Sequence, residues 1–227
     1  MSARVGIVVF PGTNCELDLA WAVERLGGTP ETLWHADAEL RGADAVVVPG
    51  GFAHGDYLRT GAIARFSPVM DAVARFAAAG GSVVGICNGF QVLTEAGLLP
   101  GALQKNAGLS FLCETVACRI ETTRSALTAL AEPGRVLSLP INHFEGNYVC
   151  DEATRRRLRD DDRIVLRYVD NPNGSLDDIA GICSEQRNVV GLMPHPERAA
   201  EPLLGSTDGA VLLRSLLATA TEGAAVA

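Results

Sequence analysis

Two short segments of this 227-residue chain carry the residue types that thiol catalysis requires. The first is a Gly-x-Cys-x-Gly run, in which Cys87 stands between Gly85 and Gly89 after an apolar stretch. Glycines on both sides let the backbone turn sharply, so that the thiol projects where a strand passes into a helix. The N-terminus of that helix favours the thiolate, which is the nucleophilic form of cysteine. We therefore predict that Cys87 is a nucleophile.

The second segment supplies a base and a carboxylate that would orient it. His195 precedes Glu197 by two residues, after an apolar run at 189–193, and a proline flanks the histidine on each side. Prolines hold the backbone near an extended conformation, in which residues two apart point the same way. A histidine oriented by a carboxylate takes the proton from a thiol and later returns it to a leaving amine. The sequence thus predicts a triad of Cys87, His195 and Glu197.

A third apolar run, at 45–48, ends in a glycine-rich loop. The backbone N–H of Gly51 in this loop and the N–H of Asn88, which directly follows the nucleophile, are expected to form an oxyanion hole. A structural alternative is that Cys87 is an ordinary buried cysteine and that the glycines only form turns. The convergence of three strand ends favours catalysis, because an open α/β sheet places its active site at that edge.

The hydrophobic pattern predicts the strands and helices that carry these residues. The expected strands of the first half lie at 5–10, 32–35, 45–48 and 82–86, and the expected helices at 16–26, 67–79 and 89–96. Further strands are expected at 111–121, 135–141, 163–169, 179–184 and 189–193, before a helix at 208–217. Alternation of strands and helices predicts parallel pairing with crossover helices. We expect an α/β fold with a mostly parallel central sheet flanked by helices and a strand-rich second half, in one domain over residues 1–227.

Composition excludes several other classes of protein. The 27 acidic and 19 basic residues give a net charge of −8, and Lys105 is the only lysine, which argues against nucleic acid as a partner. Charged residues, glycines and prolines interrupt every apolar run before the length of a membrane span, and residues 1–10 lack the features of a secretory signal. We therefore expect a cytoplasmic protein with no membrane partner. The chain has no phosphate-binding loop with lysine and no metal-ligand spacing of histidines, so we expect it to hold no cofactor and no metal.

Beyond these derivations, the chain resembles the class I glutamine amidotransferases, which have a flavodoxin-like architecture. Their Cys, His and Glu triad is matched by Cys87, His195 and Glu197, and the resemblance spans nearly the whole chain. The runs that carry it are FPGTNCE at 10–16, GGFAHGDYLR at 50–59, GICNGFQ at 85–91, NPNGS at 171–175 and MPHPER at 193–198. The GDYLR stretch points to those glutaminase subunits that serve a separate synthase of de novo purine synthesis.

The resemblance implies a substrate and a reaction. L-Glutamine would be hydrolysed to glutamate and ammonia through a γ-glutamyl thioester on Cys87. Gln91 would bind the glutamine, and Asn106 and Phe111 are further pocket candidates. The ammonia would pass to an ATP-using synthase large subunit, which converts formylglycinamide ribonucleotide into its amidine. ATP and Mg²⁺ are expected on that partner, and a small accessory subunit is expected in the assembly.

Some assignments stay open at this point. The run 142–148 reads NHFEGNY where the family pattern is Ala-His-Gly-Glu-Gly, so its contacts are undetermined, while residues 55–59 are expected to contact the synthase. One alternative function is a stand-alone thiol hydrolase of the same architecture, such as a γ-glutamyl peptidase, which needs no partner. Another is a binding or regulatory protein that keeps the fold without turnover.

Overall fold

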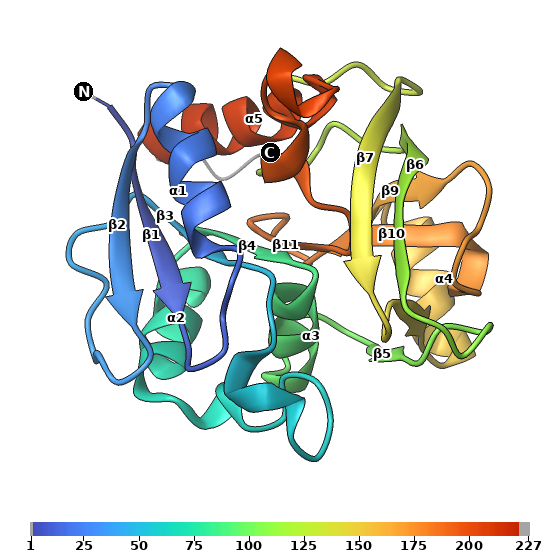
Figure 1. Ribbon diagram of the computed structural model, residues 1–227, viewed down its shortest axis with the longest axis horizontal. Helices are drawn as coiled ribbons and strands as arrows, with labels where there is room; N and C mark the ends of the chain where they lie inside the picture. Colours follow the sequence, from blue (N-terminus) through green and yellow to red (C-terminus); the bar gives the residue numbers. More distant parts are fainter. Residues whose placement is uncertain (1, 223–227) are drawn as a thin grey trace.

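The computed structural model describes residues 2–222 and shows one large twisted sheet with helices on both faces (Figure 1). Helices α1 and α5 cover one face of its parallel half, and α2 and α3 cover the other. The helices are α1 (Glu16–Arg25), α2 (Pro68–Ala78), α3 (Asn88–Glu95), α4 (Glu152–Asp160) and α5 (Asp208–Glu222). The strands are β1 (Arg4–Val9), β2 (Thr29–Trp34), β3 (Ala45–Val48), β4 (Ser82–Ile86), β5 (Ala102–Gln104), β6 (Leu112–Ile120), β7 (Val136–His143), β8 (Asn147–Val149), β9 (Ile164–Tyr168), β10 (Ile179–Cys183) and β11 (Val189–Leu192).

The large sheet has nine strands in the order β2-β1-β3-β4-β11-β10-β9-β6-β7. Strands β2, β1, β3, β4 and β11 are parallel, and the register pairs Val46 with Val83 and Val84 with Val190. From β11 onwards the neighbours pair antiparallel, which is the strand-rich second half. The expected α/β architecture is confirmed. Its parallel half carries the candidate site.

Burial explains why the central strands are apolar along their whole length. Every residue of β3 and β4 is buried, because helices cover both faces of this part of the sheet. One cluster of buried apolar side chains runs from β1 to α5. None of the helices in residues 2–222 is long and apolar enough to cross a membrane.

The predicted elements match those of the structure to within five residues at their ends. Strands β3 and β4 have the predicted bounds, whereas α5 continues to Glu222, beyond the predicted end at 217. The short strands β5 and β8, which pair with each other in a separate two-stranded sheet, were not predicted. Three residues are too few to show an alternating pattern. The predicted domain over 1–227 includes residue 1 and residues 223–227, which lie outside the described residues.

Candidate active site

The candidate catalytic residues follow neighbouring strands of the parallel half of the sheet. Gly51 follows β3, Cys87 follows β4 and His195 follows β11, and these three strands are adjacent in the sheet order. Their carboxyl ends lie at one edge, where open α/β sheets bind their ligands. Strand β1, the next neighbour of β3, adds Cys15 at the same edge. The predicted convergence of three strand ends is thus present in the structure, with a fourth strand joining it.

Cys87 has the backbone conformation of a nucleophile elbow. Its φ and ψ angles are 51° and −107°, and its N–H donates to the carbonyl of Leu192 at 2.8 Å. A side chain at Gly89 would collide with the carbonyl of Val48, so the glycine is required for α3 to approach β3. The sulfur lies 3.6 Å from the carbonyl oxygen of Asn142. A positive φ at a residue other than glycine is a strained conformation that recurs at functional sites.

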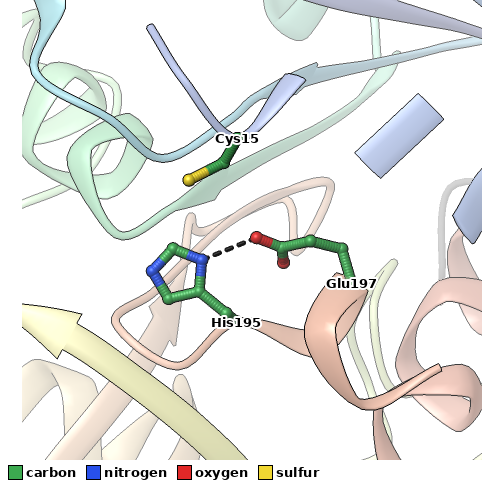
Figure 2. A group of neighbouring side chains, drawn as sticks. All are labelled: Cys15, His195 and Glu197. Carbon is green, nitrogen blue, oxygen red and sulfur yellow. Dashed lines mark hydrogen bonds and ion pairs between the residues drawn. The ribbon is translucent and has the colours of Figure 1, made fainter. Parts of the chain in front are cut away.

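His195 and Glu197 form a hydrogen-bonded pair that is excluded from water. Nδ1 of His195 lies 2.6 Å from Oε1 of Glu197, and the two side chains are 1% and 0% exposed (Figure 2). The backbone N–H of His195 donates to the carbonyl of Pro140, which fixes the segment against β7. Burial alone would lower the pKa of His195, but the charges of Glu197 and Cys87 outweigh it and raise this pKa well above its ordinary value. The charged surroundings therefore favour the imidazolium form of His195.

The side chains of Cys87 and His195 approach each other across Gly50. A Cβ atom at position 50 would lie 2.7 Å from Cε1 of His195 and 3.5 Å from Cβ of Cys87, so only glycine leaves room for the imidazole. Nε2 of His195 is buried and has no hydrogen-bond partner among the described residues. This nitrogen is free to exchange a proton with a thiol or a substrate. Catalytic hydrogen bonds are often incomplete until substrate is bound.

The two expected oxyanion donors also lie at this edge. Asn88 is the first residue of α3, where a backbone N–H has no acceptor within the helix. Gly51 has a φ of 141° and lines the same cavity as Cys87. The side chain of Asn88 accepts the N–H of Ala53 at 2.9 Å and so ties the glycine-rich loop to α3. This contact links the two segments that carry the expected oxyanion donors, and such donors act only when their position is fixed in advance.

A cavity of about 240 Å³ contains Cys87 and His195 in its lining. Gln91 lines it as well, and its amide is engaged: Oε1 accepts from Asn88 at 2.8 Å and Nε2 donates to the carbonyl of Glu145 at 2.5 Å. In this structure Gln91 therefore joins α3 to the loop after β7. The lining residues are Asn14, Cys15, Gly51, Phe52, Asp56, Thr60, Cys87, Gln91, Asn142, His143, Phe144, Glu145 and His195.

Two pocket candidates lie outside this lining, namely Asn106 and Phe111. Asn106 is buried, accepts from Gly146 at 3.0 Å and donates to the carbonyl of His143 at 3.0 Å, so it shapes the loop that lines the cavity. Phe111 is 48% exposed. Burial lowers the pKa of His143 to about 4, so this second histidine of the cavity is neutral at physiological pH. The run 142–148, whose contacts the sequence left undetermined, contributes residues 142–145 to the cavity wall.

The sequence pattern assigned no role to Cys15, but the structure places its sulfur over the His195–Glu197 pair (Figure 2). One donor atom of each of these three residues lies within 4.8 Å of the others, and this set of ligand types is one that zinc accepts. The guanidinium of Arg198 lies 3.3 Å from the Cys15 sulfur and already supplies positive charge there. We therefore interpret the group as a hydrogen-bonded cluster. No local pattern marks Cys15 for this position, because only the adjacency of β1 and β3 in the sheet brings it near His195.

Comparison with known proteins shows the family of this chain. Residues 2–208 match the CobB/CobQ-like glutamine amidotransferase domain, and the chain belongs to this family. Among its relatives is the phosphoribosylformylglycinamidine synthase subunit PurQ of Rubrobacter xylanophilus, which is 61% identical over 96% of this chain and 99% of that protein. The protein of the same name from Lacticaseibacillus casei is 54% identical over 98% of both chains.

Two solved structures share the fold of this chain, and one of them also supports its membership of the family. The structure of PurLQS from Thermotoga maritima includes a chain that is 41% identical, with a TM-score of 0.89 over 96% of this chain and 99% of that one. A GMP synthase component from Thermoplasma acidophilum is 13% identical, with a TM-score of 0.71 over 98% of this chain and 96% of its own. This second likeness shows the shared fold alone.

Proposed function

We propose that this chain is the glutaminase subunit of a phosphoribosylformylglycinamidine synthase, formed as one glutamine amidotransferase domain. The observation that carries the proposal is the approach of Cys87 and the buried His195–Glu197 pair at the carboxyl edge of the sheet. Relatives with that subunit name cover almost the whole chain and support the choice of reaction. The cavity of about 240 Å³ suits a small amino acid better than a nucleotide.

The proposed reaction uses the residues in the following order. The Cys87 thiolate attacks the side-chain amide carbon of L-glutamine, and the N–H groups of Gly51 and Asn88 stabilise the resulting oxyanion. His195 donates the proton that it took from the thiol to the leaving nitrogen, so the C–N bond breaks and ammonia departs from a γ-glutamyl thioester. His195 then removes a proton from water, which attacks the thioester. The C–S bond breaks, glutamate leaves, and the proton returns to the sulfur.

The proposal also includes partners. Ammonia would be delivered to a synthase large subunit that binds ATP and Mg²⁺ and aminates formylglycinamide ribonucleotide, with a small accessory subunit in the complex. The similarity to a chain of PurLQS supports this assembly. Residues 55–59 are the proposed contact with the synthase, because Tyr57 and Leu58 are 74% and 90% exposed beside the cavity. Substitution Leu58→Asp should weaken co-elution with the synthase, whereas Leu130→Asp, at another exposed leucine, should not; equal co-elution of both variants would refute this contact.

A direct test of the nucleophile uses a diazo-ketone analogue of glutamine, which alkylates an activated thiol in a glutamine site. Mass spectrometry of the protein in complex with its synthase should find the label on Cys87 and not on Cys113, the exposed cysteine of β6. Excess glutamine should protect Cys87. Labelling of Cys113 alone, or labelling that glutamine does not slow, would contradict the proposal. Rapid turnover of glutamine or γ-glutamyl peptides by the isolated chain would instead favour a stand-alone hydrolase.

A further inference from the structure

The cavity beside Cys87 has an unbalanced charge. Its lining includes the carboxylates of Asp56 and Glu145 but, among the described residues, no lysine or arginine. Asp56 lies in the loop after β3, and Glu145 lies between β7 and β8, so two segments far apart in the sequence bring acidic residues to one cavity. The groups that act on the Asp56 carboxyl include Asn88 and Glu145 and no cation. A carboxylate in a cavity without a cationic partner is stabilised when a positively charged ligand binds beside it.

Asp56 is anchored to the catalytic elements. Its Oδ1 accepts from Nδ2 of Asn88 at 3.0 Å, and the same Nδ2 donates to Gln91 at 2.8 Å. The second carboxylate oxygen has no hydrogen-bond partner among the described residues, and the residue lines the cavity. Because Asn88 also supplies an expected oxyanion donor, one residue joins this carboxylate to the reacting centre. The position is therefore fixed relative to Cys87.

The backbone around Asp56 is held in a conformation that chains adopt at a cost. His54, Asp56 and Leu58 have φ angles of 54°, 53° and 70°. Burial raises the pKa of the Asp56 carboxyl to about 6, and the charge of Glu145 adds to this effect. A strained backbone and a poorly solvated charge both destabilise the folded chain. Such features are typical of functional positions, where the function of the residue outweighs this cost.

We propose that Asp56 binds the α-ammonium group of L-glutamine, with Glu145 strengthening the negative potential of the cavity. This inference rests on the proposed function, since glutamine is the substrate that brings both an amide to Cys87 and a cation to the cavity. The ammonium supplies a positive charge beside Asp56 and Glu145, which have no lysine or arginine near them in the cavity lining formed by residues 2–222. The same contact selects glutamine over simple amides of similar shape. It also places substrate recognition in the loop that carries the exposed Tyr57 and Leu58.

Substitution Asp56→Asn tests this inference with little change of shape. Asparagine keeps an oxygen that can accept from Asn88 and tolerates a left-handed backbone, so the loop should retain its conformation. The test uses the protein in complex with its synthase and compares glutamine with 4-carbamoylbutanoate, which lacks the α-amino group. The KM for glutamine should rise about 10- to 100-fold while kcat changes by less than about threefold. The inhibition constant of the des-amino analogue should change by less than about twofold.

The matched control is Asp71→Asn, an exposed aspartate in the first turn of α2 and outside the cavity lining, which should leave both constants unchanged. The melting temperature of the Asp56→Asn protein should be no lower than that of the wild type, because the variant removes a poorly solvated charge. Wild-type protein that releases no ammonia from glutamine would refute the proposed function. If the wild type hydrolyses glutamine while the Asp56→Asn variant still prefers glutamine to the analogue by the wild-type ratio, that result would refute the ammonium contact alone. An equal loss of affinity for glutamine and for the analogue would also refute the ammonium contact and would indicate a structural role for Asp56.

Discussion

Oε1 of Glu197 lies 2.6 Å from Nδ1 of His195, in a position where neither side chain is more than 1% exposed. A carboxylate at this distance requires the proton on Nδ1, which leaves Nε2 to exchange a proton with the reacting groups. The pair keeps its geometry because the N–H of His195 is bonded to Pro140 and the next residue begins a short 3₁₀ helix, Pro196–Ala199. Glu197 therefore orients the imidazole of His195 and stabilises its charged form, as the proposed mechanism requires of the base.

Substitutions in this pair should have unequal effects on glutamine hydrolysis. His195→Ala removes the group that transfers the proton, so kcat should fall by about 10⁴ or more. Glu197→Gln keeps the shape but loses the charge that raises the pKa of His195, and its loss should be about 10- to 100-fold smaller. Steady-state release of glutamate measures both. Comparable losses in the two variants would mean that the pair has only a structural role.

Substitution Gly50→Ala, in the glycine-rich loop after β3, should lower the rate of glutamine hydrolysis by displacing His195. The added methyl group would lie 2.7 Å from Cε1 of His195 and 3.2 Å from the sulfur of Cys15, so the imidazole must move. Misplacement of a catalytic group by about 1 Å costs on the order of 10² in rate, and we expect a loss of that size in kcat. Gly108→Ala is the control, because its methyl group would meet only Oγ of Ser110 at 3.5 Å. Full activity of the Gly50→Ala variant would contradict the position assigned to His195.

Two thiols lie at this site, and their roles are predicted to differ. The sulfur of Cys15 lies 3.3 Å from Nη2 of Arg198 and 3.3 Å from Oδ1 of Asn14, and it lies outside the strand-to-helix turn that carries Cys87. Cys15→Ala should therefore lower kcat by less than about tenfold, through a small shift of His195. The diazo-ketone analogue should still label Cys87 in this variant. A complete loss of labelling would show that Cys15 takes part in the chemistry.

The affinity for glutamine should depend on pH through Asp56. Its pKa is raised to about 6, so the carboxyl becomes neutral as the pH falls through that value and loses its attraction for an ammonium group. The KM for glutamine should consequently rise as the pH falls from about 7 to 5. The carboxylate of Glu145 faces the same group and favours its protonation, so Glu145→Gln should move the midpoint to lower pH. A KM profile that is the same in Asp56→Asn and wild-type protein would contradict this assignment.

The convergence of the candidate residues at one edge could be predicted from the sequence because each segment leaves a local signal. The Gly-x-Cys-x-Gly run marks the turn after β4, and His195 and Glu197 follow the apolar run of β11. Such runs do not give the order of the strands in the sheet. In most arrangements of parallel strands, however, the carboxyl ends of these strands lie close together. The resemblance to a family then supplied the substrate.

Other residues of the site leave no local signal. Asp56 and Glu145 are single acidic residues in loops, and their shared cavity depends on the packing of the loop after β7 against α3. Cys15 is one of six cysteines, and only the adjacency of β1 and β3 brings it near His195. Asn106 and Phe111 were predicted as pocket residues from the resemblance, whereas the structure places the amide of Asn106 in contacts that shape the loop 142–148. Contacts between distant loops are the part of a site that periodicity does not encode.

Two nitrogen sources, compared in the complex reconstituted with the synthase, show whether Cys87 is the nucleophile that opens the amide of glutamine. We predict that Cys87→Ala abolishes formylglycinamidine ribonucleotide formation from glutamine and leaves formation from added ammonium salts at the wild-type rate. The wild-type chain should support both. Continued use of glutamine by the Cys87→Ala complex would contradict the account, because the thiolate of Cys87 would then not be needed to open the amide.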